Sequence, residues 1–301
     1  MTNIKSKALK LDLFAYLKVL FDLMKPRVMS LVIFTCVVGL LIAPVEVDFW
    51  NAFVSILAVA LGSGAAGVLN MWYEADLDSV MTRTCLRPIP TGKVTKKEAL
   101  IFGILASVIS VTILYLFSNL VATLILVTTI LYYVFIYTVW LKQKTSQNIV
   151  IGGVSGALPP VIGWAVATGN ISFESMILFL IIFIWTPSHF WALSLYKMED
   201  YKNANIPMLP VISGVKVTKL NIFVYALLLF PIILAPFFLN YFGTIYLLIS
   251  GTLATYYIYI CYKLFRVQDS NLEEKIAKQV FGFSILFLFL VFTSILIDSI
   301  V

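Results

Sequence analysis

The stretch WNAFVSILAVALGSGAAGVLNMWYEADLD, residues 50–78, places a long apolar run directly before three carboxylates. Residues 50–73 carry no charge, and about 20 mostly apolar residues are what a helix needs to cross a bilayer. Glu74, Asp76 and Asp78 then follow within five residues. The stretch therefore predicts a membrane-spanning helix that ends in an acidic cluster.

The composition of the whole chain agrees with this prediction. Of its 301 residues, 61% are hydrophobic and 12% are charged, whereas soluble domains have about 45–50% apolar and about 25% charged residues. The mean hydropathy is +1.00. These values exclude a soluble enzyme and a nucleic-acid-binding protein. The apolar runs are continuous and do not alternate, which argues against a membrane β-barrel.

Nine apolar runs of about 17–25 residues are long enough to span a membrane as helices. The predicted spans are 28–45, 50–70, 98–117, 120–140, 148–168, 172–195, 218–239, 243–264 and 279–298. No long polar segment separates them. We therefore expect one all-α domain over residues 1–301, a polytopic membrane protein with nine transmembrane helices around a central cavity.

The basic residues predict the orientation, because Lys and Arg concentrate in cytoplasmic loops. The connections at 44–49, 118–119, 169–171 and 240–242 contain no Lys or Arg. All 21 Lys and Arg lie in the alternate segments, which are 1–27, 71–97, 141–147, 196–219 and 263–278. With nine spans, this places the N-terminus in the cytoplasm and the C-terminus outside.

The N-terminal segment, residues 1–27, allows two interpretations. Its apolar residues recur at helical spacing, with Lys10, Lys18 and Asp22 among them, as in a helix that lies on the inner membrane surface before Pro26 opens the first span. A solvated basic tail that follows the positive-inside rule gives the same pattern.

The acidic cluster has a direction. On a helix, Asn70, Glu74 and Asp78 fall within an arc of about 80°, one above another, while Asp76 points about 160° away from Glu74. A row of carboxylates is costly unless cations lie among them, and acidic residues at the membrane edge are rare and usually functional. The shared face therefore makes this cluster the first candidate for a functional site.

Two arginines follow the cluster, Arg83 and Arg87, before Pro88 and Pro90 end any helix. Mg²⁺ binds through one or two carboxylates together with substrate phosphates, and arginine grips phosphate oxygens in a bidentate manner. The pattern thus indicates a diphosphate–Mg²⁺ site at the cytoplasmic end of a membrane helix. An ordinary charged loop with internal salt bridges has the same composition.

A second polar cluster follows the sixth span, at the same predicted face of the membrane. Facing carboxylate groups would allow metal ions to hold both ends of one diphosphate. Taken by itself, the cluster also fits an ordinary helix end with mixed charges. Its residues are Glu199, Asp200, Tyr201, Lys202 and Asn205.

The run from Asn70 to Pro88 resembles the first aspartate-rich motif of the UbiA-type intramembrane prenyltransferases. More narrowly, it has the form NxxxExDxDxxMxRTxxRP of the protohaem IX farnesyltransferase (haem O synthase) group. Four more stretches are similar to that group: LMKPRVMSLV at 23–32, LKQKTSQNIVIGGVSGALPPVIGWA at 141–165, WTPSHFWALSLYKMEDY at 185–201 and IPMLPV at 206–211. The resemblance covers the chain from about residue 20 to its end. Asn205 departs from it, because the group's pattern has glycine there.

The resemblance implies a reaction in which haem B, farnesyl diphosphate and water give haem O and diphosphate, on the route to terminal oxidases. It implies that Mg²⁺ neutralises the leaving diphosphate, and that Arg83, Arg87 and Lys142 stabilise the departing charge. The implied metal ligands are Asn70, Glu74, Asp76, Asp78 and Asp200. The farnesyl chain and the porphyrin would need an apolar chamber, and the candidates for its walls are Tyr132, Tyr133, Trp164, Phe190 and Trp191, although such residues more often face lipid or pack. Tyr201, with Lys142, His189 and Trp164, is a candidate for binding the substrates.

His189 is the only histidine, and it lies inside the sixth span. In a protein that binds haem it is a candidate axial or orienting ligand. A hydrogen-bonded histidine that supports the WTPSHFW segment is the alternative. In the fifth span, Gly152, Gly153 and Gly156 suggest close helix approach, and Pro159 and Pro160 suggest a kink. Pro187 suggests a kink in the sixth span.

Two other functions remain open from the residues. One is a related prenyltransferase that acts on a quinone or chlorophyll precursor. The other is a transporter, although transporters usually place polar groups at the midplane and show duplicated halves. The partners expected are farnesyl diphosphate, haem B, the lipid bilayer and a haem A synthase, with no nucleic acid. The absence of a transit peptide favours a bacterial plasma membrane.

Overall fold

The computed structural model describes residues 12–301, and within that range it contains helices and no strand. The elements are α1 Leu13–Leu23, α2 Pro26–Leu41, α3 Phe49–Tyr73, α4 Ala75–Val80, α5 Lys96–Phe117, α6 Leu120–Leu131, η1 Tyr132–Leu141, α7 Asn148–Ala157, α8 Pro159–Thr168, α9 Phe173–Tyr196, α10 Met198–Asn203, α11 Leu209–Phe238, α12 Thr244–Arg266 and α13 Ser270–Ile300.

The predicted all-α membrane fold is confirmed. Within the described residues, eight stretches are long and apolar enough to cross a membrane, and the number is nine if α1 and α2, which are bent by 58° from each other, form one further span. Helix α6 continues directly into the π-helix η1, so the two form one span. Helices α7 and α8 also form one span, broken at Leu158 just before Pro159, where a kink is expected.

Two helices begin earlier than predicted. Helix α11 starts at Leu209, with a break at Gly214, and α13 starts at Ser270, whereas the apolar runs begin near 218 and 279. An apolar run marks only the part of a helix that lies in the hydrocarbon, so polar turns beyond it were missed. Pro187, for which a kink is expected, lies inside α9, which runs unbroken over Phe173–Tyr196.

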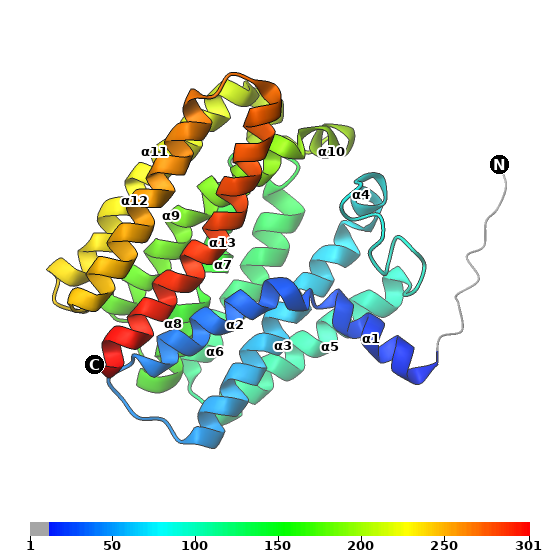
Figure 1. The fold of residues 1–301 in the computed structure, drawn as a ribbon. Coiled ribbons are helices and arrows are strands. Elements are labelled where there is room, and N and C mark those ends of the chain that lie inside the picture. The colour runs from blue at the N-terminus through cyan, green and yellow to red at the C-terminus, as the bar shows by residue number, and fades with distance from the viewer. Residues whose placement is uncertain (1–11) are drawn as a thin grey trace.

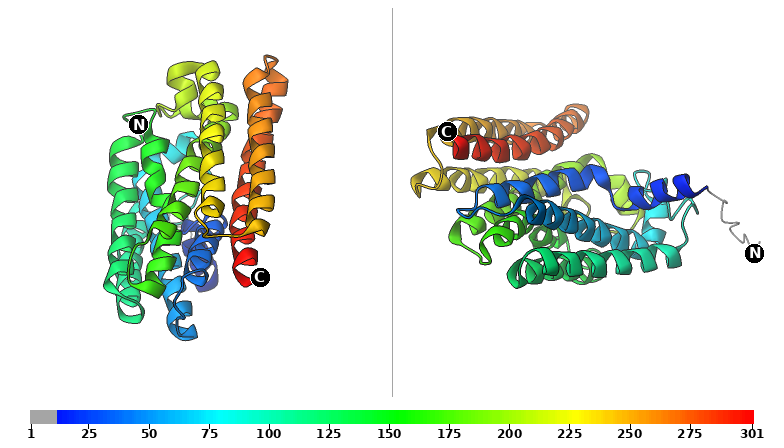
Figure 2. Two further views of the ribbon diagram at one scale, coloured as in Figure 1. Left: turned by 90° about the vertical axis from the view of Figure 1, so that its left-hand side faces the viewer. Right: turned by 90° about the horizontal axis from the view of Figure 1, so that it is seen from below.

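The helices pack side by side in two groups (Figure 1). One buried core joins α9, α11, α12 and α13, and a second joins α2, α3, α5, α6 and α8. Figure 2 shows α12 and α13, coloured orange to red, on the opposite side of the bundle from α5. Helices α4 and α10 lie together at one end of the bundle, and the C-terminus lies at the other end (Figure 1).

Glycines bring helices close together. A Cβ atom on Gly163 of α8 would lie 1.9 Å from the carbonyl oxygen of Cys36 in α2, and one on Gly152 would lie 2.1 Å from the ring of Tyr137. A Cβ atom on Gly153 would lie 3.1 Å from a side chain of α9. The expectation of close approach fails for Gly156, which has no neighbouring atom within 4 Å because it faces away from the packed side of α7.

Helix α1 has an apolar outer surface. Leu13, Phe14, Leu17 and Phe21 are all more than half exposed, while Leu23 is buried. An amphipathic helix that exposes large apolar side chains is typical of a membrane interface, and this agrees with the first of the two interpretations of the N-terminal segment. Residues 1–11 of that segment lie outside the described residues.

Candidate functional site

The site forms where α3 gives way to α4. Helix α3 ends at Tyr73, Glu74 lies in the break, and α4 begins at Ala75. The turn continues the helical path closely enough that Asn70, Glu74 and Asp78 all remain inside, with exposures of 2%, 2% and 3%. The predicted shared face is therefore present, and it faces the protein. Buried carboxylates of this kind need cationic or hydrogen-bonding partners, because isolated buried charges are costly.

Each of the two buried carboxylates has a cationic partner. Nζ of Lys142, which follows η1, lies 2.5 Å from Oε1 of Glu74. That approach lacks the angles of a hydrogen bond, so Oε1 has a charged neighbour but accepts no hydrogen bond from the described residues. Nη1 of Arg87 donates to both oxygens of Asp78, at 2.8 and 2.7 Å. Lys142 and Arg87 thus lie beside the buried carboxylates, as expected for the basic residues that the resemblance assigns to the diphosphate.

Lys25 is a third basic residue at the site, and it is not among the site residues predicted from the sequence. It lies between α1 and α2, outside the membrane spans, in a left-handed conformation with φ of 54°, which costs about 1–2 kcal/mol for a residue other than glycine. Its Nζ donates to Oδ1 of Asn70 at 2.7 Å. Burial, and after it the nearby Arg87, lower the pKa of the Lys25 ammonium to about 7. Three basic side chains, those of Lys25, Arg87 and Lys142, thus lie around the same pair of buried carboxylates, as expected where an anion binds.

Asn70 connects Lys25 to the π-helix. Its Nδ2 donates to Oγ1 of Thr138 at 3.1 Å, and the Thr138 hydroxyl donates to the carbonyl of Tyr133 five residues earlier, at 2.8 Å. Both amide atoms of Asn70 are thus used to hold neighbouring groups in place. The wider turns of η1 point Tyr133, Tyr137 and Thr138 to this side, and the rings of Tyr133 and Tyr137 stack 5.4 Å apart.

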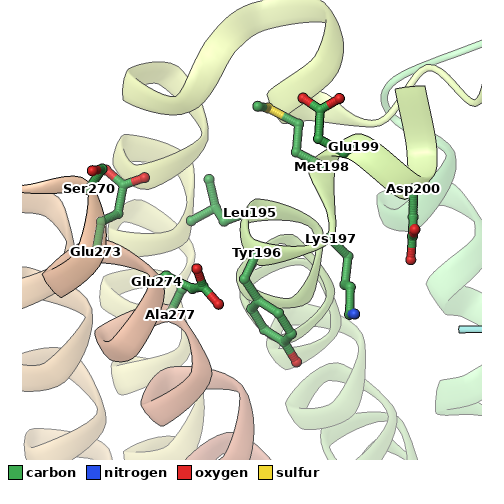
Figure 3. Close-up of a pocket in the computed structure, with 10 residues that line it drawn as sticks. All are labelled: Leu195, Tyr196, Lys197, Met198, Glu199, Asp200, Ser270, Glu273, Glu274 and Ala277. Carbon is green, nitrogen blue, oxygen red and sulfur yellow. The ribbon is translucent and has the colours of Figure 1, made fainter. Parts of the chain in front are cut away.

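Asp200 of the second cluster lies next to the first. Its two oxygens accept hydrogen bonds from Oγ1 of Thr82, at 2.8 and 2.7 Å, and Thr82 comes two residues after α4. Asp200 is 8% exposed. Figure 3 shows the carboxylates of Glu199 and Asp200 pointing to opposite sides of α10, so only Asp200 faces the site. Spacing alone does not distinguish them.

A small apolar cluster holds α10 against α4. Tyr201 is buried in it, with Met81, Ile149, Ile206 and Met208. Lys202 lies on the exposed side of α10.

Asn205, where the group's pattern has glycine, has a φ of 53°. This left-handed conformation explains the glycine, and asparagine is among the residues that tolerate it best. The loop that carries Asp200 therefore keeps its shape despite the departure.

Of the predicted site residues, Asp76 points away from the site and Arg83 is exposed. The side chain of Asp76 is 88% exposed and pairs with Lys96, as the predicted angle between Asp76 and Glu74 requires. Arg83 is exposed and forms no ion pair with any residue of the described range. Over residues 12–301, no three His, Cys, Asp or Glu side chains are grouped so that they could hold a metal ion by themselves.

Trp164 and His189 lie in the spans, away from the ionic groups. Trp164 of α8 is 6% exposed, and its Nε1 has no hydrogen-bond partner among residues 12–301. His189 of α9 lies between two aromatic rings and contacts α13. Phe190, the next residue, packs against the cluster that contains Tyr201.

The comparisons with known proteins agree with this geometry. Residues 32–295 match the UbiA prenyltransferase family. A protein of Pelagibacter ubique named protoheme IX farnesyltransferase is 57% identical over 281 residues, which cover 93% of each chain. One of Parvibaculum lavamentivorans with the same name is 48% identical, over 93% of this chain and 88% of the relative.

Solved structures share the fold at low sequence identity. A digeranylgeranylglyceryl phosphate synthase superposes with a TM-score of 0.78 at 20% identity, covering 95% of this chain and 99% of that one. A UbiA homologue of Archaeoglobus fulgidus, bound to GPP and Mg²⁺, gives 0.65 at 15% identity, covering 93% and 99%. From the match over 32–295 and the identity to these relatives, the chain belongs to the UbiA prenyltransferase family.

Proposed function

We propose that this chain transfers the farnesyl group of farnesyl diphosphate to haem B, giving haem O and diphosphate. The observation that carries the proposal is the pair of buried carboxylates, Glu74 and Asp78, each with a cation within 2.8 Å at the end of an apolar bundle. The names of the relatives at 48–57% identity support the choice of haem B and farnesyl among prenyltransferase substrates.

The donor atoms fit Mg²⁺. Glu74, Asp78 and Asp200 offer only oxygen, which hard divalent cations prefer, and Oε1 of Glu74 is a buried oxygen that accepts no hydrogen bond from residues 12–301. Few carboxylates suffice, because the phosphates of the substrate complete the shell of Mg²⁺. When bound, the ion would supply positive charge to the leaving diphosphate. The homologue of Archaeoglobus fulgidus, which was solved with GPP and Mg²⁺, supports this proposal.

The cations bind the diphosphate by exchanging partners. Lys142 and Arg87 neutralise Glu74 and Asp78 in the structure. With Glu74 and Asp78 engaged as ligands of a bound Mg²⁺, the side chains of Lys142 and Arg87 would be free to bind phosphate oxygens. Lys25, whose Nζ lies beside Asn70, adds a third donor, and Arg83, which forms no ion pair within residues 12–301, adds a further positive charge. These fixed donors stabilise the charge that grows on the diphosphate as its bond to the farnesyl carbon breaks.

The transfer breaks one bond of the farnesyl diphosphate and forms two new bonds on the haem, to the farnesyl carbon and to the hydroxyl oxygen. The allylic C–O bond breaks and diphosphate leaves with the electron pair, a carbon of a haem vinyl group forms the new C–C bond, and water supplies the hydroxyl of haem O with release of a proton. The apolar surroundings of Tyr137, Phe190 and Tyr201 would keep other water from the allylic carbon. We place this site at the cytoplasmic face of a bacterial plasma membrane, and a haem A synthase would receive the product.

The proposal is tested with the purified protein in lipid nanodiscs, given farnesyl diphosphate, Mg²⁺ and one of two acceptors. With haem B we expect haem O, identified by mass spectrometry, and with a prenylatable aromatic acid we expect no product. Chelation of Mg²⁺ should abolish turnover, and adding Mg²⁺ back should restore it. A product from the aromatic acid and none from haem B would instead indicate a quinone-pathway prenyltransferase.

A further inference from the structure

His189 is held in one orientation by its neighbours. Its ring lies between those of Trp185, 4.3 Å away at 16°, and Phe281 of α13, 4.6 Å away at 22°. Both faces of the imidazole are therefore covered. Its Nδ1 lies 2.6 Å from Oγ of Ser284, and the side chain of Trp185 donates to the carbonyl of the same serine at 2.9 Å. With its faces covered and Nδ1 engaged, only the Nε2 edge of the ring is free.

The hydrogen bonds identify the tautomer. The hydroxyl of Ser284 has one proton, and Oγ lies 2.6 Å from the carbonyl oxygen of Phe281, which can only accept. Ser284 therefore donates to Phe281 and accepts from His189, so the proton of the neutral ring is on Nδ1. Nε2 then carries a lone pair, which is the form of histidine that binds a metal ion.

The Nε2 edge of the ring is the accessible one. His189 is 8% exposed, Nε2 has no hydrogen-bond partner within residues 12–301, and it is not among the fully enclosed polar atoms. The ring of Phe190 meets the imidazole edge to face at 5.2 Å, and Phe190 also packs against the cluster that contains Tyr201 and Met81. Phe190 thus joins the imidazole to the apolar cluster at the site.

We propose that Nε2 of His189 ligates the iron of the haem substrate, and that Ser284 is a positioning residue that fixes the tautomer and the ring. This inference rests on haem B being the acceptor, as proposed above. A metal-binding histidine typically donates its other N–H to a fixed acceptor, which is the arrangement of Nδ1 and Ser284 here. The ligand would hold the porphyrin at one depth and in one orientation, so that a peripheral vinyl group can meet the farnesyl carbon.

The opposing interpretation is that His189 only joins α9 to α13. The two interpretations differ in whether the affinity of the protein for a porphyrin depends on the iron in that porphyrin. If His189 is a ligand, the protein binds haem B more tightly than protoporphyrin IX without iron, and His189→Ala removes that difference while affinity for the metal-free porphyrin stays. We expect haem B to bind at least about tenfold more weakly to the variant, with a shifted Soret band that added imidazole restores.

The matched control is Ser188→Ala. Ser188 is buried in α9 beside His189 and bonds to Tyr257 of α12 at 2.8 Å, but it does not touch the imidazole. The Ser188→Ala variant should leave the affinity for haem B, the affinity for the metal-free porphyrin and the Soret band unchanged. Ser284→Ala should weaken haem B binding by about tenfold and leave metal-free porphyrin binding intact.

His189→Gln provides a second variant that keeps a polar side chain between the helices, and it should lose the preference for haem B as His189→Ala does. Unchanged haem affinity and an unchanged Soret band in both variants would overturn the inference. Equal loss of both porphyrins in both variants would do so too, because it would mean that His189 only holds the helices together. If the native protein bound neither porphyrin, the proposed function itself would be wrong.

Discussion

At the scale of single residues, the carboxylates of the acidic motif differ in how deeply they are buried and in which basic side chain they pair with. Asp78 is buried and held by both hydrogen bonds of Arg87, whereas Asp76, two residues away, lies in water beside Lys96. Truncating one partner of a buried pair leaves a charge uncompensated, while an exposed pair contributes at most about 1 kcal/mol. The same acidic motif thus contains one carboxylate that lies inside the site and one that lies outside it.

Asp78→Asn should therefore lower kcat for haem O formation by about 100-fold or more, since it removes a metal-binding oxygen and frees Arg87. Asp76→Asn is the matched control, with the same chemical change in the same short helix, and should stay within about threefold of the native rate. Thermal unfolding of both variants checks that each is folded. Equal losses in the two variants would contradict the assignment of Asp78 alone to the site.

At the scale of elements, the sequence predicts what depends on local pattern. The spans follow from apolar length, and the inward face of Asn70, Glu74 and Asp78 follows from helical spacing. Lys25 and Thr82 could not be predicted as site residues, because their partners Asn70 and Asp200 lie 45 and 118 positions away. The local signs for Lys25 are its place directly before Pro26 at the start of a span and its position within the stretch LMKPRVMSLV at 23–32.

The π-helix η1 was also missed, because its apolar run is the same as that of an α-helix. Its wider turns are visible in backbone bonds such as the one from the N–H of Lys142 to the carbonyl of Tyr137, five residues earlier. Its position has a consequence for α7, because Gly152 contacts the ring of Tyr137 where a Cβ atom would lie 2.1 Å away. Tyr137 in turn lies beside Lys142, whose Nζ is 5.9 Å from the centre of the ring.

Gly152→Ala should displace Tyr137 and lower activity by about 10- to 100-fold, because small displacements of positioning groups are costly in catalysis. It should also destabilise the protein by about 1–3 kcal/mol through overpacking. Gly156→Ala, one turn further along the same helix, meets no atom within 4 Å and should leave activity and thermal stability near the native values. Similar activity loss in both variants would argue against this contact.

At the scale of the whole molecule, the positions of the helix ends decide how many spans there are. Helix α2 has 16 residues, a length of about 24 Å, which is short for a hydrocarbon core of about 30 Å. Yet Lys25, at its start, bonds to Asn70 near the end of α3, and the connection of residues 42–48 joins the opposite ends of the same two helices. Helix α2 therefore covers nearly the same depth as α3.

If α2 crosses the membrane, the chain has nine spans, and its two ends lie on opposite sides. Because every Lys and Arg falls in alternate connections, the positive-inside rule places α4 and α10 in the cytoplasm and Val301 outside. In a Gram-negative bacterial host, alkaline phosphatase fused after Val301 should be active, and the same enzyme fused after Lys144 should be inactive. A green fluorescent protein should give the reverse pattern at both sites. Five spans separate Lys144 from Val301 whether or not α2 crosses, so a third fusion, at the N-terminus, decides between nine spans and eight. A fluorescent protein there should fluoresce if α2 crosses. An N-terminal fusion without fluorescence, with the patterns at Lys144 and Val301 unchanged, would mean eight spans, with α1 and α2 entering and leaving on the outer side, and Lys25 would then reach Asn70 from a re-entrant segment.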